Sequence, residues 1–107
     1  MERADDKPEG MEDESMNRLT VFYLEGCPYC RNARKAFEAL TAENKAYGDV
    51  KVDWVEESQN AAMADTYDYY RVPSVFMDKE KLYEAAPSDT YEVIKARFKA
   101  ALDAALA

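Results

Sequence analysis

Hydrophobic residues in the first half of the chain follow two patterns in turn, one typical of strands and one typical of helices. Residues 19–24 (Leu-Thr-Val-Phe-Tyr-Leu) form an almost continuous apolar run rich in β-forming side chains, which predicts a buried central strand. From Tyr29 onward the apolar residues recur every three or four positions, which predicts a helix. The side chains expected on its buried face are Ala33, Ala36, Phe37 and Leu40.

The second half of the chain continues the alternation. Residues 50–54 alternate apolar and charged side chains with a period of two, which predicts a second strand. We expect a helix to follow this strand, with an apolar side formed by Met63, Tyr67 and Tyr70. Residues 75–77 and 82–84 flank a charged turn at residues 78–81, which predicts two short strands joined by that turn.

A long amphipathic helix is predicted at the end of the chain. Asp89, with Glu92 three residues later, has the spacing of a capping box at the start of this helix. The apolar face of the helix is formed by Ile94, Phe98, Ala101, Leu102 and Ala105.

The predicted order of elements is β-α-β-α-β-β-α, and a chain of 107 residues is one domain by size. The first connection between strands is long enough for a right-handed crossover, so the first two strands should be parallel. The last two strands are joined by a short turn and should be antiparallel. These features predict an α/β fold in which a four-stranded mixed sheet has helices on both faces.

Negative charge is concentrated at the beginning of the chain. Residues 1–17 contain seven acids and two bases, and so carry five of the eight net negative charges. Because this segment has few apolar side chains to bury, we expect a disordered acidic tail at residues 1–17 and a folded domain at residues 18–107. We favour a solvated leader or a start codon placed too early as the origin of the tail, with a docking role as the alternative.

Composition also limits the partners and the location of the protein. The net charge of −8 argues against nucleic acid and anionic membrane surfaces as partners. No apolar run approaches the length of a membrane span, and the N-terminus lacks the apolar stretch of a secretory signal. We therefore expect a cytoplasmic protein, in which a cysteine pair is catalytic, redox-active or metal-binding rather than a structural disulfide.

The only two cysteines lie in one tetrapeptide, Cys27-Pro28-Tyr29-Cys30, between the first predicted strand and the first predicted helix. Two thiols at this spacing form a dithiol redox site. Cys27 should face the unpaired N–H groups of the helix N-terminus, which favour a thiolate, and proline suits the first helical position. We expect Cys27 to be the nucleophile and Cys30, one turn later and more covered, to be the resolving thiol.

The residue inventory limits other kinds of site. With two cysteines and no histidine, one chain cannot supply the four Cys or His ligands of a structural zinc site without carboxylates. The absence of histidine also excludes a Cys–His catalytic pair. We expect no metal ion and no bound cofactor.

Three features of the chain point in the same direction. They are the tetrapeptide Cys27-Pro28-Tyr29-Cys30, the dipeptide Val72-Pro73 before the third predicted strand, and the order of the elements. In these features the chain resembles the dithiol glutaredoxins of the thioredoxin superfamily, over about residues 18–106. The resemblance implies a compact thioredoxin fold and the activity of a thiol–disulfide oxidoreductase.

The resemblance also implies roles for residues outside the cysteine pair. Pro73 would be a cis proline packed opposite the cysteines, and the Val72 backbone would pair with an incoming substrate strand. Tyr29 would line the substrate groove. Ser88 and Asp89 lie where members of the family bind the γ-glutamyl end of glutathione.

The chain departs from the family pattern at positions where glutathione would bind. Members of the family commonly have a Gly-Gly pair before the last helix and a basic residue two positions before the first cysteine, where this chain has Ala85-Ala86 and Glu25. Pro87 also removes an amide donor. Each lost hydrogen bond costs about 1–3 kcal/mol, so we expect glutathione to bind weakly.

The sequence therefore predicts a monomeric thiol–disulfide oxidoreductase that reduces disulfide-containing proteins or glutathione mixed disulfides, with glutathione as a co-substrate. One alternative is a thioredoxin-like protein disulfide reductase that is recycled by a flavoprotein of the thioredoxin reductase type. A further alternative, from another class of protein, is an iron–sulfur or interaction module with little redox turnover.

Overall fold

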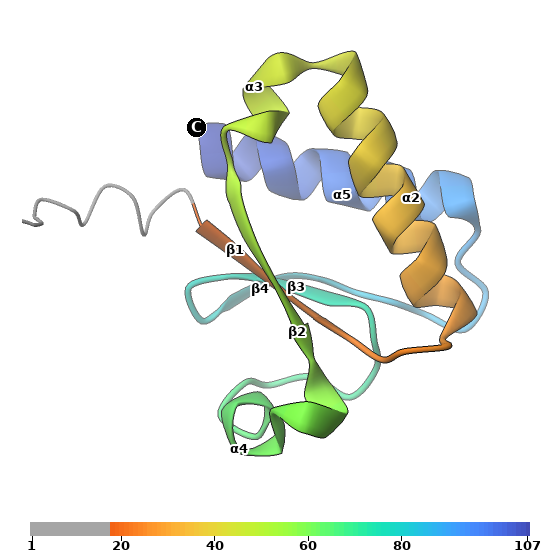
Figure 1. The fold of residues 1–107 in the computed structure, drawn as a ribbon, viewed down its shortest axis with the longest axis vertical. Coiled ribbons are helices and arrows are strands. Elements are labelled where there is room, and N and C mark those ends of the chain that lie inside the picture. Colours follow the sequence, from red (N-terminus) through yellow and green to blue (C-terminus); the bar gives the residue numbers. More distant parts are fainter. Residues whose placement is uncertain (1–17) are drawn as a thin grey trace, which may run out of the picture.

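The computed structural model describes residues 18–107, and the elements carry the labels of Figure 1. The acidic tail predicted at residues 1–17 lies outside the described residues. The strands are β1 (Arg18–Tyr23), β2 (Lys51–Glu56), β3 (Ser74–Met77) and β4 (Glu80–Glu84). The helices are α2 (Pro28–Glu43), α3 (Lys45–Gly48), α4 (Ala61–Ala64) and α5 (Tyr91–Leu106), and a 3₁₀ turn lies at Glu57–Gln59.

The four strands form one mixed sheet in the order β2-β1-β3-β4. β1 is parallel to β2 and antiparallel to β3, and β3 is antiparallel to β4. Val21, near the middle of β1, pairs with Trp54 of β2 and with Val75 of β3. This topology confirms the predicted α/β thioredoxin fold, to which the short helix α3 is an addition that the sequence pattern did not predict.

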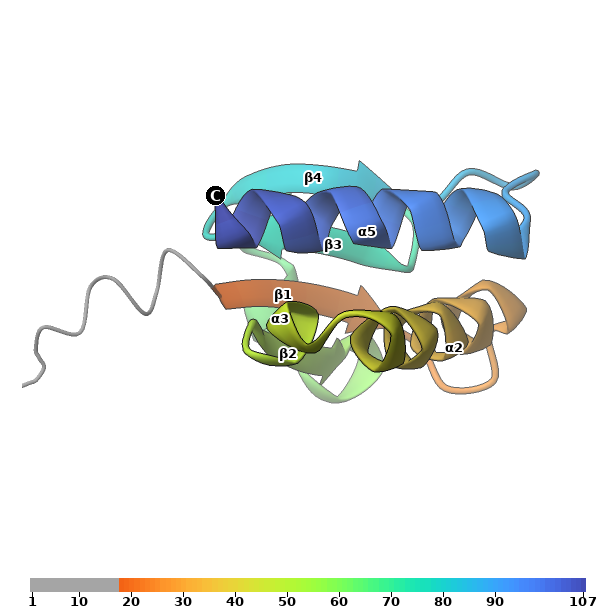
Figure 2. The ribbon, with the colours of Figure 1, turned by 90° about the horizontal axis from the view of Figure 1, so that it is seen from above.

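One face of the sheet carries the main hydrophobic core. Figures 1 and 2 show α2, α3 and α5 together on this side of the strands. Alternate residues of a strand point to the same face of a sheet. Val21 and Val75 are fully buried because they point to the face that the helices cover. They belong to a buried cluster that also contains Leu19, Ala33, Ala36, Leu40, Ile94, Phe98 and Leu102.

The opposite face of the sheet is covered by aromatic side chains rather than by a long helix. The ring of Phe22 lies 4.8 Å from that of Tyr67 and 4.9 Å from that of Tyr69, measured between centroids. Phe76 of β3 lies 4.9 Å from the Tyr67 ring. Stacked and edge-to-face pairs at these distances add to the stabilisation that the buried area provides.

The helix predicted after the second strand is wrong in its extent. α4 has four residues, and the chain between α4 and β3 contains neither helix nor strand. Tyr67 packs on the sheet, but Met63 is 41% exposed and Tyr70 is 90% exposed. Pro73 disfavours helical backbone in the residue before it, and tyrosine is a weak helix former, so the aromatic contacts with Phe22 determine the path of the chain.

The capping box predicted for the last helix is also wrong. α5 begins after Thr90, whose Oγ1 accepts a hydrogen bond from the Val93 N–H at 3.2 Å. The Asp89 carboxylate accepts hydrogen bonds from the Tyr83 hydroxyl at 2.5 Å and from the Ala86 N–H at 2.9 Å. Because threonine is itself a good N-cap residue, Asp89 is left to fix the loop that leads into α5.

Candidate active site

Cys27 and Cys30 lie where β1 leads into α2, and both are free thiols. Cys27 is the N-cap residue of α2, with an extended backbone and a proline in the first helical position. Its side chain makes no capping hydrogen bond, so the N–H groups at the helix N-terminus remain available to a thiolate. Cys27 is partly exposed and Cys30 is only 5% exposed, so the site presents one thiol to solvent and buries the other.

Cys30 is held in its protonated form. Burial raises the pKa of its thiol from 9.0 to about 12, although a hydrogen bond from the Leu24 amide acts in the opposite direction. The Cys27 side chain and the negative charge of Glu57 also contribute to this raised pKa. Because the thiolate is the species that attacks a disulfide, Cys30 is a poor first nucleophile near neutral pH.

The loop between β1 and α2 is a tight turn that places Cys27. Gly26 has a φ of 82°, a conformation that glycine adopts without steric penalty. The Cys27 N–H donates to the Leu24 carbonyl at 3.3 Å, and the Arg31 guanidinium donates to the Gly26 carbonyl at 3.3 Å. These contacts fix the position of Cys27 relative to the end of β1.

Glu56, the last residue of β2, anchors the same turn from the neighbouring strand. Its carboxylate accepts hydrogen bonds from the Glu25 N–H at 3.1 Å, the Ser58 N–H at 2.8 Å and the Ser58 hydroxyl at 2.5 Å. The Ser58 hydroxyl and then the Glu25 amide lower the pKa of Glu56, which keeps it ionised. The sequence reasoning missed Glu56; the signal that could have found it was an acid ending the strand parallel to β1.

The Val72–Pro73 peptide bond is cis, as the resemblance implied. Pro73 is fully buried, and its carbonyl oxygen accepts a hydrogen bond from the Ala85 N–H at 3.0 Å. Val72 is half-buried and lines a groove of about 260 Å³ together with Tyr29. The structure therefore brings Tyr29 and Val72 to one groove.

The groove is bounded by the start of α2 and by the loop before α5. The Tyr29 hydroxyl donates a hydrogen bond to the Pro87 carbonyl, which links these two parts of the chain. The other residues that line the groove are Leu24, Glu57, Tyr70, Arg71, Ala85 and Ala86. Sequence reasoning did not single out Glu57 or Arg71, whose opposite charges lie on the groove wall.

Ser88 and Asp89, predicted to bind the γ-glutamyl end of glutathione, are not among the residues that line this groove in the described part of the chain. Ser88 is exposed. Asp89 already accepts hydrogen bonds from Ala86 and Tyr83, and these two donors, the Ala86 amide first, lower the pKa of its carboxyl. The structure thus gives Asp89 a role in ordering the loop before α5.

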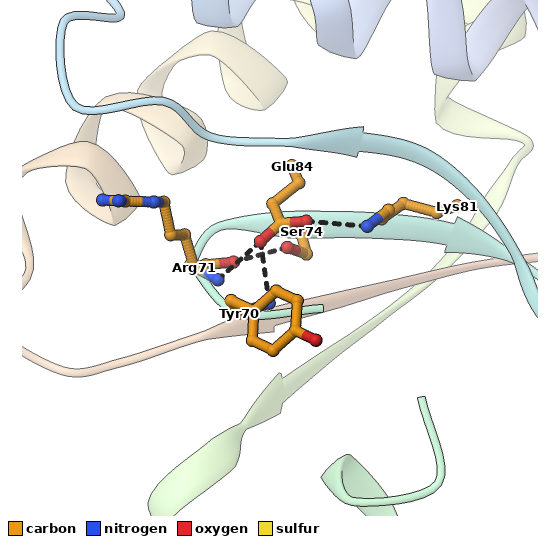
Figure 3. A network of polar contacts seen from close by, with 5 residues as sticks. All are labelled: Tyr70, Arg71, Ser74, Lys81 and Glu84. Carbon is orange, nitrogen blue, oxygen red and sulfur yellow. Dashed lines mark hydrogen bonds and ion pairs between the residues drawn. The ribbon is translucent and has the colours of Figure 1, made fainter. Parts of the chain in front are cut away.

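Glu84 of β4 anchors the segment that precedes the cis peptide bond, as Figure 3 shows. Its Oε2 accepts hydrogen bonds from the N–H groups of Tyr70 and Arg71, both at 2.7 Å, and its Oε1 lies 2.7 Å from Lys81 Nζ. The Ser74 hydroxyl donates to the Arg71 carbonyl at 2.5 Å. Burial acts to raise the pKa of Glu84, but Lys81 and the two amides outweigh it and lower the pKa.

A second cavity, of about 150 Å³, adjoins the cysteine pair and is lined by Cys27, Cys30, Arg31, Arg34 and Trp54 among others. The Arg34 guanidinium lies over the Trp54 ring, 4.2 Å from its centroid, and 5.6 Å from the centroid of Tyr23. These contacts hold a positive charge on the cavity wall. The charge favours anionic species beside the cysteines.

Comparison with known proteins gives one family match. The family model described as Glutaredoxin matches residues 19–82, which include the cysteine motif and Val72–Pro73 and end before Ala85. No curated protein matches the chain. Within residues 18–107 no helix is both long enough and apolar enough to cross a membrane. The matched domain supports thiol–disulfide oxidoreductase chemistry, and because it spans more than half of the 107 residues, the chain belongs to the glutaredoxin family.

Proposed function

We propose that the protein is an enzyme that reduces disulfides of protein substrates through Cys27 and Cys30. The observation that carries this proposal is the contrast between the two thiols: Cys27 is partly exposed at the start of α2, and Cys30 is buried and protonated. Cys27 lies two residues before Tyr29, which lines the groove beside the cis proline. A substrate strand in this groove would pair with the Val72 backbone.

The proposed reaction has two steps. The Cys27 thiolate attacks one sulfur of the substrate disulfide, the substrate S–S bond breaks, and the leaving sulfur takes up a proton. Cys30 then gives its proton to solvent and attacks the Cys27 sulfur of the mixed disulfide, which releases the second substrate thiol. The protein ends with a Cys27–Cys30 disulfide, having given two electrons to the substrate.

We further propose that a flavoprotein of the thioredoxin reductase type regenerates the dithiol, with glutathione as a weaker co-substrate. Ala85 and Ala86 line the groove where the family has glycines, and the Pro87 carbonyl already accepts a hydrogen bond from the Tyr29 hydroxyl. Glu25 adds a negative charge two residues before Cys27, which opposes the carboxylates of glutathione. These features support weak binding of glutathione.

The proposed setting of this activity is the cytoplasm, where thiols are kept reduced. There the protein would act as a monomer and without a bound cofactor. Its substrates would be disulfide-containing proteins.

The test is a pair of coupled assays on a peptide with an internal disulfide, one with thioredoxin reductase and one with glutathione and glutathione reductase. We expect faster turnover with the flavoprotein, and none in Cys27→Ser. Cys30→Ser should lose peptide reduction but keep turnover of a glutathione mixed disulfide, which needs only one thiol. Wild type that turns over neither substrate would refute the enzyme and favour an iron–sulfur or interaction module. Equal efficiency with glutathione would refute the choice of reductant.

A further inference from the structure

The segment from Tyr70 to Val72 forms part of the groove wall but belongs to no helix or strand. Its backbone therefore depends on contacts from other parts of the chain for its order. At its start stands Tyr70, which is 90% exposed, more than any other large hydrophobic residue in the described chain. A large exposed side chain at the rim of a binding groove is well placed to contact a partner.

Glu84 supplies the order that the segment lacks (Figure 3). Both N–H groups at the start of the segment, those of Tyr70 and Arg71, donate to one charged oxygen of Glu84. Hydrogen bonds to an ionised acceptor are about twice as strong as neutral ones. The Arg71 carbonyl is fixed by Ser74, so both sides of this residue are held before the chain reaches Val72.

The order of the Tyr70–Val72 segment matters more for polypeptide substrates than for small disulfides. A polypeptide that pairs with Val72 must align several backbone groups, and each group of the enzyme that is already fixed reduces the entropy lost on binding. At about 3.3 Å per residue, a strand that pairs with Val72 passes Tyr70 within two residues. A small disulfide that reaches only Cys27 gains nothing from this edge.

We propose that Glu84 is a positioning residue that fixes the Tyr70–Val72 edge, and that the Tyr70 ring it presents contacts polypeptide substrates, which makes the protein selective for polypeptide disulfides over small ones. The inference rests on the proposed function, because it concerns how the same groove chooses its substrate. Glu84 acts through the backbone that it holds and does not take part in the chemistry.

The test measures kcat and KM for two substrates, a disulfide-bonded peptide and bis(2-hydroxyethyl) disulfide. For the peptide we expect Glu84→Ala and Tyr70→Ala to raise KM by about tenfold. Tyr70→Ala removes a contact with the peptide, and Glu84→Ala loosens the backbone that makes such contacts, a loss worth roughly one factor of ten in each case. Glu84→Gln keeps an acceptor oxygen and should restore part of the affinity. For the small disulfide both constants should stay unchanged in all variants.

The difference between the pH profiles of wild type and Glu84→Gln gives a second readout, because the other carboxylates titrate in both proteins. Glu84 has a lowered pKa, so it holds the segment at neutral pH and loses its hold as pH falls through that pKa. In wild type, KM for the peptide should therefore rise on acidification, and in Glu84→Gln this part of the rise should be absent.

Matched controls separate this role from general damage. Lys81→Met removes the ion-pair partner of Glu84 but leaves both N–H groups bonded, and should change the peptide KM by less than twofold. The inference would be overturned if the peptide KM is unchanged in Glu84→Gln and Tyr70→Ala. It would also be overturned if these variants raise KM equally for both substrates. If Glu84→Ala does not fold, the peptide KM values of Glu84→Gln and Tyr70→Ala decide whether the inference holds. Wild type inactive on both substrates would instead refute the proposed function.

Discussion

Alkylation of the two thiols tests the division of labour between Cys27 and Cys30. Burial is the main cause that raises the pKa of the Cys30 thiol from 9.0 to about 12. At pH 7 its thiolate fraction is then roughly 10⁻⁵, about a thousandfold below that of an unperturbed thiol. Since alkylating agents react with the thiolate, Cys30 should react at least about a thousandfold more slowly than a free thiol, and its 5% exposure slows it further.

The assay is iodoacetamide treatment of the reduced, folded protein at pH 7, with mass spectrometry of the two modified peptides over time. We expect Cys27 to be modified within minutes and Cys30 to remain free. Cys27→Ser isolates Cys30, whose slow reaction should persist, because burial is the largest cause of its raised pKa. Unfolding in denaturant should bring Cys30 to the rate of a free thiol. If Cys30 is modified first, or at the rate of a free thiol in the folded protein, the assignment of nucleophile and resolving thiol is wrong.

Two further predictions concern glutathione and the core. The triple variant E25K/A85G/A86G should turn over about tenfold faster with glutathione than wild type, because it restores one favourable charge and a closer approach of glutathione to the backbone. The assay coupled to glutathione reductase measures this rate, and the rate with the flavoprotein is the control. No gain in the glutathione-coupled rate would contradict the explanation. Leu102→Ala should lower the free energy of unfolding by about 3 kcal/mol in urea titrations, since Leu102 is fully buried, whereas Leu106→Ala, 43% exposed, should cost under about 1 kcal/mol. Similar losses in both would show that Leu102 lies outside the stabilising core.

The parts of the fold that sequence reasoning predicted are those set by local patterns. The continuous apolar run of β1 and the helix that begins at the cysteine motif depend on neighbours in the chain, and both are in place. The helix expected after β2 is wrong in its extent, and in its place Tyr67 and Tyr69 pack against Phe22 of β1. Such packing depends on tertiary structure and leaves no periodic signal in the segment itself.

In the candidate site, too, sequence reasoning predicted the features set by local motifs and missed those set by contacts between distant residues. The motif placed Cys27 at a helix N-terminus, and a dipeptide indicated the cis peptide bond at Pro73. Sequence reasoning did not single out Glu56 or Glu84, because the Glu25 N–H that Glu56 holds lies 31 residues away, and the N–H groups that Glu84 holds lie 13 and 14 residues away. Every residue except proline has a backbone N–H, so the sequence does not show which residue such a carboxylate will bond.

The chain between α4 and β3 has two sets of residues with separate tasks. Tyr67 and Tyr69 are half-buried against the sheet, whereas Asp68 and Tyr70, at the positions between and after them, are exposed. Substitutions at residues 68 and 70 would alter the surface offered to a partner while the packing beneath the sheet is preserved. Related proteins could thus diverge in the partners they accept by changing alternate positions in a segment of four residues, without rebuilding the fold that presents it.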